Sequence, residues 1–132
     1  MAEISVTASA IRGESSGMSR GTAGATITAG QTLYLDSNSK LQLADANNTS
    51  ADEVVGIALH GSLADQPLAY SSSGNVTFNA ALTAGIFYVV GTTAGSIAPI
   101  SDATTGWRVL KLGYATSTTN LRLEITDTGV IL

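Results

Sequence analysis

The chain has few residues that could carry out chemistry, and they are isolated from one another. His60 is the only histidine among 132 residues, and there is no cysteine. A Ser-His-Asp triad or a multi-histidine metal site would therefore need a second chain, and disulfides and thiolate metal sites are excluded. His60 follows the apolar run VVGIAL and precedes Gly61, where a loop histidine is normally solvated or hydrogen-bonded. We predict that it is structural and not catalytic.

The ten carboxylates offer the pairs that glycoside hydrolysis requires, but their local contexts favour turns. Turn-like sequences surround five of them: Asp36, Asp45, Asp65, Asp102 and Asp127. An aspartate in a turn normally accepts hydrogen bonds from its own backbone. The glycine-rich segment before residue 25 lacks the strand and the Gly-Lys-Ser/Thr ending of a phosphate-binding loop. We therefore expect no enzymatic activity, no cofactor and no metal site.

Composition argues against nucleic-acid and membrane partners. Only 12% of the residues are charged, about half of the usual fraction of about 25%. A net charge of −4 with six basic residues does not suit a phosphate backbone. No apolar run approaches the roughly 18 residues that span a bilayer, and MAEISVTASAIRG lacks the features of a signal peptide. We expect a soluble protein made in a cytoplasm, with a weakly charged surface that suits permanent assembly.

The elements that position these residues should be short β-strands. Apolar residues come in runs such as IFYVV, WRVLKLGYA and LRLEI, each closed by Gly, Thr, Ser, Asn or Asp. In LRLEI, apolar and charged residues alternate, which is the period of a half-buried strand. We predict an all-β fold, a small single-domain β-barrel or sandwich over residues 25–132. Its buried residues should include Tyr88, Trp107, Val109, Leu112, Leu121, Leu123 and Ile125, with Arg122 and Glu124 outside.

The β-domain also contains an internal similarity. Thr28-Ala29-Gly30 precedes QTLYLD as Thr83-Ala84-Gly85 precedes IFYVV, and LQLA then corresponds to SIAPI. VVGIAL corresponds to VLKLGYA, which aligns Gly56-Ile57-Ala58 with Gly113-Tyr114-Ala115, and QPLAYS corresponds to NLRLEIT. Gly56 within a strand indicates a bulge or a close backbone approach. We predict a duplicated β-unit; chance similarity among Thr/Ala/Gly-rich segments is the alternative.

Residues 1–24 have a different character from the rest. ISVTASAI could pair as one strand, whereas RGESSGMSRGTAG has almost no large apolar groups to offset its ordering entropy. One interpretation is a frayed terminus. The other is an extended N-terminal arm that becomes ordered on the sheet edge of a partner. On the second interpretation, the partner-binding residues are Ile4, Val6, Ile11 and Arg12, and the arm contributes little to the stability of the β-domain.

The phrases already quoted, in their order TAGQTLYLDSNSKLQLADA, EVVGIALHGSLADQPLAY, ALTAGIFYVV and GWRVLKLGYATSTTNLRLEI, resemble the capsid-decoration or cement proteins of tailed bacteriophages. The likeness covers roughly residues 28–125, and phage tail and fibre proteins share some of it. It implies an all-β protein without a cofactor, on the capsid exterior of the virion, that stabilises the mature shell with the major capsid protein as its partner. It supplies no catalytic residues.

The alternative function is a carbohydrate- or receptor-binding β-module of a phage fibre or bacterial surface. Such a module would stack sugars on exposed aromatic side chains, drawn from Tyr34, Tyr70, Tyr88, Trp107 and Tyr114.

Self-association is expected under either function. Sheet edges of a monomer are normally protected by lysine or proline, and few such residues are available, namely Lys40, Lys111, Pro67 and Pro99. We expect a homo-oligomer that forms a closed ring, with a trimer favoured over a dimer by analogy of fold.

Overall fold

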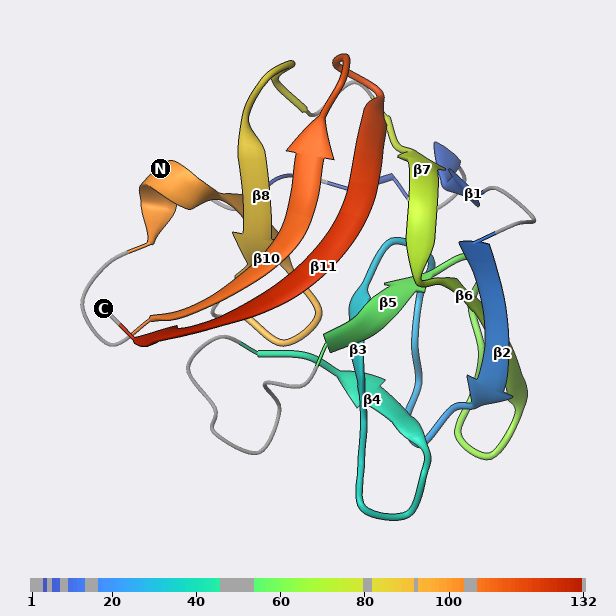
Figure 1. The fold of residues 1–132 in the computed structure, drawn as a ribbon. Helices are drawn as coiled ribbons and strands as arrows, with labels where there is room; N and C mark the ends of the chain where they lie inside the picture. The colour runs from blue at the N-terminus through green and yellow to red at the C-terminus, as the bar shows by residue number, and fades with distance from the viewer. Residues whose placement is uncertain are drawn as a thin grey trace.

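The protein folds into two antiparallel β-sheets, as the computed structural model shows (Figure 1). The structure describes residues 4, 6–7, 10–13, 17–45, 54–79, 82–91, 93–103 and 107–131. The helical element whose bounds lie within the described residues is a short 3₁₀ segment, η3 (Ile100–Asp102). The predicted all-β fold is confirmed, and the two sheets are consistent with a small β-sandwich.

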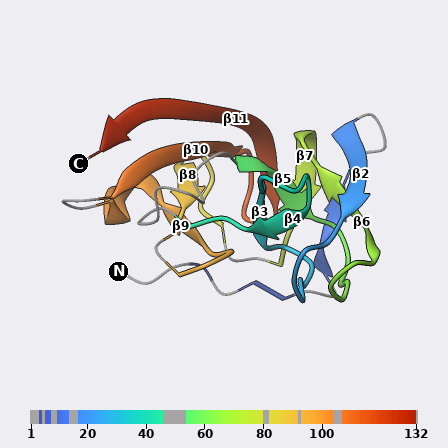
Figure 2. The same ribbon diagram turned by 90° about the horizontal axis from the view of Figure 1, so that it is seen from below.

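The five-stranded sheet has the order β2-β6-β5-β3-β4 and the six-stranded sheet the order β1-β7-β11-β10-β8-β9. In the view of Figure 2, β11 curves along one side of the molecule, while within its sheet it lies between β7 and β10. The strands of the five-stranded sheet are β2 (Met18–Thr22), β3 (Thr32–Leu35), β4 (Leu41–Leu43), β5 (Val54–Ala58) and β6 (Pro67–Ser71). Those of the six-stranded sheet are β1 (Arg12–Gly13), β7 (Ser73–Thr77), β8 (Phe87–Val90), β9 (Ile97–Pro99), β10 (Arg108–Ala115) and β11 (Asn120–Ile131).

The two sheets repeat one topology. Read from one edge, the first sheet has the order β4-β3-β5-β6-β2 and the second β9-β8-β10-β11-β7, with β1 added at the end. Each strand of the first set therefore has a counterpart in the second, in the same chain order. The predicted duplication is confirmed, and we call β2–β6 repeat 1 and β7–β11 repeat 2. Comparison of the two halves of the sequence did not identify β2 and β7 as counterparts.

Local hydrogen bonds repeat along with the strands. Gly30 N donates to Ala58 O at 2.8 Å, and Gly85 N donates to Ala115 O at 2.7 Å. The two glycines have φ of 88° and 84°, a left-handed conformation that glycine adopts without the penalty of a side chain. The Thr-Ala-Gly phrase recurs because each repeat needs this turn before its second strand.

Two further glycines permit a close approach of neighbouring strands. A Cβ atom at Gly56 would overlap the carbonyl oxygen of Ser71, and one at Gly113 would overlap that of Arg122. The register of β3 against β5 shifts next to Gly56, and the registers of β10 against both its neighbours shift next to Gly113. The predicted bulge or close approach at Gly56 is confirmed and has a counterpart in repeat 2.

The prediction of a separate N-terminal arm is wrong for the described part of residues 1–24. β2 pairs with β6 along its whole length, and β1 pairs with β7. Ala23 forms a bridge with Leu41, which brings the end of β2 to β4 and joins the two edges of the five-stranded sheet. A backbone ladder needs no apolar side chains, so a segment rich in serine and glycine can complete a sheet. Within the segment ISVTASAI, the described residues at 4, 6–7 and 10 are not in a strand.

The buried residues form two clusters. The larger lies mainly in repeat 2 and contains all of the predicted core residues, with Val109 and Ile125 partly buried at its margin. The smaller lies inside the five-stranded sheet and consists of Ala23, Ile27, Leu33, Leu41, Ala58 and Leu68. Arg122 and Glu124 are exposed and form an ion pair, with 3.1 Å between Nε and Oε1. The inward face of β11 is therefore confirmed.

Replacing Leu123 by Ala should lower the free energy of unfolding by about 2–5 kcal/mol, because its side chain is only 1% exposed and its removal leaves a cavity. Chemical denaturation followed by circular dichroism measures this loss. The neighbouring variant Arg122→Ala is the control and should change stability by no more than about 0.5 kcal/mol. A loss under half a kcal/mol for Leu123→Ala would contradict the assignment of the inward face.

Candidate functional site

The four residues predicted to bind a partner do not form one surface. Ile11 is 3% exposed and belongs to the larger core cluster, so it is not available for docking. Arg12 is exposed in β1, and its Nη1 donates to Ile11 O at 2.8 Å. Ile4 and Val6 are partly buried against the same core. The backbone N–H of Ile4 donates to Ile97 O at 2.9 Å, at the outer edge of β9.

Ile4 and Val6 line a cleft of about 390 Å³ between the two repeats. Its other walls are the turn before β3 and the turn between β8 and β9; the polar side chains lining it are Thr28, Gln31, Thr93 and Ser96. Gln31 Oε1 accepts a hydrogen bond from Thr28 N at 2.8 Å. None of the lining side chains is ionisable. The cleft can receive a small uncharged group or part of a protein surface, and its described lining offers no ionisable side chain to activate the Ser and Thr hydroxyls.

His60 is part of the backbone hydrogen-bond network, as predicted. Its Nε2 accepts the N–H of Ala69 at 3.0 Å, and its Nδ1 lies 2.8 Å from Gly61 O. Since Nε2 is the acceptor, Nδ1 must carry the proton that it donates to the Gly61 carbonyl. The Nε2 bond thus holds the segment after β5 to β6, while the Nδ1 bond stays within that segment.

Of the five aspartates predicted to lie in turns, Asp36 and Asp65 do so, whereas Asp45 follows β4 without a turn, Asp102 lies in the 3₁₀ segment η3, and Asp127 lies in β11. Asp36 Oδ1 accepts the backbone N–H groups of Asn38 and Lys40 at 2.8 and 3.0 Å, and Oδ2 accepts Gln42 Nε2 at 2.9 Å. Asp65 lies in a turn with φ of 68° and accepts Lys40 Nζ at 2.6 Å. Asp127 is not in a turn, because β11 continues through it to Ile131. No group of three potential metal ligands occurs among the described residues.

The aromatic residues divide into buried and accessible sets. Trp107 is 8% exposed and its Nε1 donates to Val90 O at 3.0 Å, while Tyr88 is 2% exposed and its hydroxyl accepts Thr83 N at 2.8 Å. Neither ring can stack on a ligand. The accessible members of the predicted set are the half-buried Tyr34, Tyr70 and Tyr114.

Sequence reasoning missed one exposed aromatic group on the outer face of the six-stranded sheet. Phe87 is 40% exposed and pairs across β8 and β10 with Tyr114, with 5.9 Å between ring centroids and 69° between planes. Lys111 Nζ lies 4.0 Å from the centroid of the Phe87 ring. The available signal was strand alternation: Tyr88 points inward, so its neighbour Phe87 must point outward.

No protein-family model and no curated protein matches this chain. Among the described residues, the structure contains no helix with the length and apolar character needed to cross a membrane.

Removing residues 1–24 should lower the melting temperature by at least about 5 °C, because it deletes β1 and β2 and takes Ile11 and Ala23 out of the two cores. Differential scanning calorimetry measures this shift. Two neighbouring substitutions provide a matched pair: Ile11→Ala should cost about 2–5 kcal/mol, and Arg12→Ala much less. An unchanged melting temperature in the truncated protein would support the prediction of a separate arm.

The pKa of Asp36 should lie below its ordinary value, because Gln42 and then the backbone N–H of Lys40 donate to the carboxylate. A depressed folded-state pKa means that the carboxylate stabilises the turn above the unfolded-state pKa, and that this contribution is lost as pH falls through the folded-state value. An NMR titration of the Asp36 carboxyl group measures it. Gln42→Leu should raise the pKa, whereas Gln31→Leu, which removes a side chain bonded to Thr28 instead, should leave it unchanged.

Proposed function

We propose that this protein is a structural virion protein that binds the outer surface of the mature phage capsid and stabilises the shell. The observation that carries the proposal is the surface of the described chain. Exposed apolar side chains lie among uncharged polar ones, while His60 and Asp36 accept hydrogen bonds from the backbone of their own chain. The resemblance of residues 28–125 to capsid-decoration proteins supplies the identity of the partner, the major capsid protein.

The duplicated fold suits this role physically. A protein that binds only the assembled shell stabilises it by mass action, since dissociation would require loss of the bound protein. Only 12% of the residues are charged, so copies placed close together on a shell repel one another weakly. No cofactor is needed, and the proposed location is the capsid exterior after synthesis in the host cytoplasm.

The proposed contact with the capsid is the rim of the cleft at Ile4 and Val6, with the exposed Arg12 nearby in sequence. Ile11 no longer belongs to it. Because Ile4 already donates its backbone N–H to Ile97, docking relies on apolar side chains at the rim and does not extend the sheet of a partner.

We also propose a homo-oligomer, a closed ring with a trimer favoured over a dimer. Five large apolar side chains are exposed in the described part of the chain: Met18, Leu35, Leu63, Phe87 and Ile100. Several copies bound together would gain affinity for a symmetric shell through their high effective concentration.

The purified protein should co-sediment with empty expanded capsids and leave immature shells unbound, because only the expanded lattice offers the completed docking surface. Bound protein should also raise the temperature at which the capsids fall apart. Co-sedimentation and light scattering measure these two effects. Ile4→Asp with Val6→Asp should abolish binding, whereas Leu63→Asp, on the loop after β5, should retain it. Equal binding to both shells, or to neither, would contradict the proposal.

The alternative is a carbohydrate- or receptor-binding β-module, and the accessible ring of Phe87 with Lys111 and Tyr114 favours it. The buried Trp107 makes its fluorescence a poor reporter of sugar binding. Chemical-shift changes of Tyr114 on addition of phage-receptor polysaccharides, lost in Phe87→Ala, would support this function over capsid binding.

A further inference from the structure

Repeat 2 covers part of the surface of repeat 1 through its β8–β9 turn. Thr32 N donates to Gly95 O at 3.0 Å, and Gly95 N donates to Ala44 O at 2.7 Å. Both Thr32 and Ala44 are fully buried, as is Ile57, the cross-strand partner of Thr32. We call these three residues, Thr32, Ala44 and Ile57, the covered face of repeat 1.

Repeat 2 has the equivalent surface, and among the described residues this surface is more exposed to solvent than its counterpart on repeat 1. Phe87 corresponds to Thr32, because each begins a strand two residues after its turn glycine, Gly85 or Gly30. Phe87 pairs with Tyr114 as Thr32 pairs with Ile57.

The third pair of counterparts is Ile100 and Ala44, which directly follow β9 and β4. Phe87 is 40% and Ile100 is 38% exposed, although their counterparts are fully buried. We call Phe87, Ile100 and Tyr114 the open face.

The composition of the open face indicates an interaction site and not a surface adapted to remain in contact with solvent. A terminal repeat normally presents a polar outer face, because it lacks the neighbour that covers the equivalent surface of inner repeats. Here Phe87 stands in place of Thr32, Ile100 in place of Ala44, and Tyr114 in place of Ile57, so the uncovered surface carries larger side chains than the covered one, two of them fully apolar. Exposed apolar groups of this kind mark interaction sites.

Repeat 1 has a counterpart of the turn that covers it, and in the described part of the chain this counterpart contacts only its own repeat: Ser39 N donates to Asp36 O at 3.0 Å, and Lys40 Nζ lies 2.6 Å from Asp65 Oδ1. The β3–β4 turn, residues 36–40, is the counterpart of the β8–β9 turn that covers repeat 1. Ser39 and Gly95 both have positive φ, 62° and 81°, and each precedes the residue whose carbonyl closes its hairpin. Residues 37–39 are exposed.

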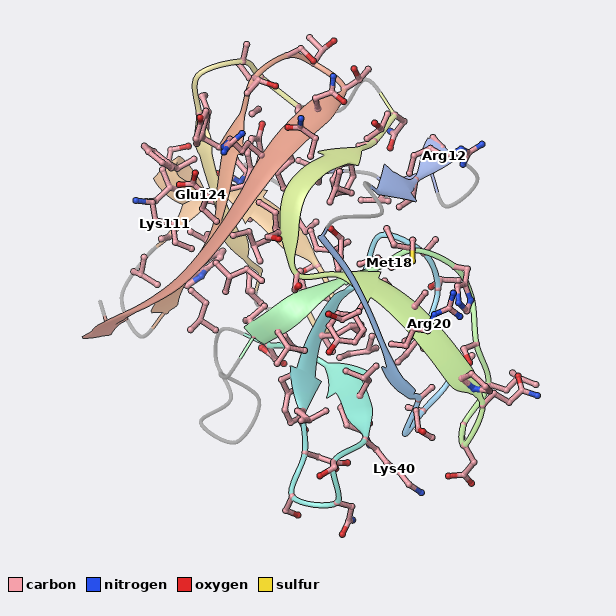
Figure 3. All side chains as sticks on the ribbon, turned by 45° about the vertical axis from the view of Figure 1, so that its right-hand side comes forward. Arg12, Met18, Arg20, Lys40, Lys111 and Glu124 are labelled. Atoms are coloured by element: carbon pink, nitrogen blue, oxygen red, sulfur yellow. The ribbon has the colours of Figure 1, made fainter. Side chains whose placement is uncertain are left out.

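We propose that the open face binds the β3–β4 turn of a second copy of this chain, in the position that the β8–β9 turn occupies on repeat 1. Because Ser39 N already donates to Asp36 O, this contact rests on side-chain packing and does not copy the N–H bond of Gly95. Figure 3 places Lys111, beside the open face, and Lys40, on the turn, at distant ends of the molecule. The open face and the β3–β4 turn of one chain are too far apart to contact each other. The two surfaces of each contact must therefore come from different chains, which makes the contact head-to-tail. A head-to-tail contact leads to a closed ring when its rotation closes. The proposal deepens the homo-oligomer of the proposed function and is independent of the capsid.

Cysteine crosslinking tests the contact directly, since the chain has no cysteine of its own. Asn38→Cys places a thiol on the exposed turn and Ile100→Cys places one on the open face. When the two variants are mixed and oxidised, disulfide-linked pairs of Asn38→Cys with Ile100→Cys should exceed either homodimer at least tenfold, roughly the ratio of a 1.4 kcal/mol preference. Leu63→Cys, a control at a position more exposed than Ile100, should form no such excess with either. Absence of the mixed product, or a predominance of Ile100→Cys homodimers, would overturn the head-to-tail contact.

Measurement of the molar mass of the full chain is the second test. Sedimentation equilibrium should give an oligomer for the unmodified protein and for Leu63→Asp, and a monomer for Phe87→Asp with an unchanged circular dichroism spectrum. A monomer for the unmodified protein would overturn the inference, whether or not the protein binds capsids. An oligomer that fails to bind expanded capsids would leave this contact standing and contradict the proposed function instead.

Discussion

Two hydrogen bonds of Gly95 join the repeats, and the shared core depends on them. They connect the β8–β9 turn to the ends of β3 and β4, at Thr32 and Ala44, where the ladder of repeat 1 would otherwise leave an unpaired N–H and C=O. Buried backbone groups without partners are costly, so this junction fixes how the repeats face each other. Ala44 and Ile57 of repeat 1 then belong to the larger core cluster, which the two repeats share. Neither five-stranded unit would cover these atoms alone.

The sequence predicts this fold well wherever the controlling interactions are local. Strand alternation in β11 identifies the inward residues, and the Thr-Ala-Gly phrases mark turns that need a glycine with positive φ. Gly56 and Gly113 were recognisable as counterparts because each allows a carbonyl oxygen of the next strand to occupy the space of a side chain. In each case a residue type is required by its immediate neighbours, so the requirement is visible in the sequence.

The N-terminal segment shows where such reasoning fails. β2 reads Met-Ser-Arg-Gly-Thr and has no apolar alternation, since its contribution is a row of backbone hydrogen bonds to β6. Gly21 lies against the Leu41 side chain, so the absence of a side chain there is a packing requirement and not a mark of disorder. The counterpart strand β7 is similarly poor in apolar residues, which concealed the first strand of each repeat from the comparison of sequences. The predicted binding role of Ile11 failed for the same reason: an isolated isoleucine in a polar segment was needed by the core.

The candidate interaction surface could not be predicted, because it depends on which of two equivalent faces is covered. Thr32 and Phe87 begin counterpart strands in the same register, and nothing adjacent to either in sequence distinguishes a buried position from an exposed one. The difference arises from a contact 63 residues away in the chain, between Thr32 and Gly95. A duplicated unit joined head-to-tail necessarily leaves one copy of its internal contact surface unused at each end. In this chain the unused surfaces are an apolar face and an exposed polar turn. On the proposed head-to-tail contact, tandem duplication would provide both halves of an intermolecular contact without any new binding motif in the sequence.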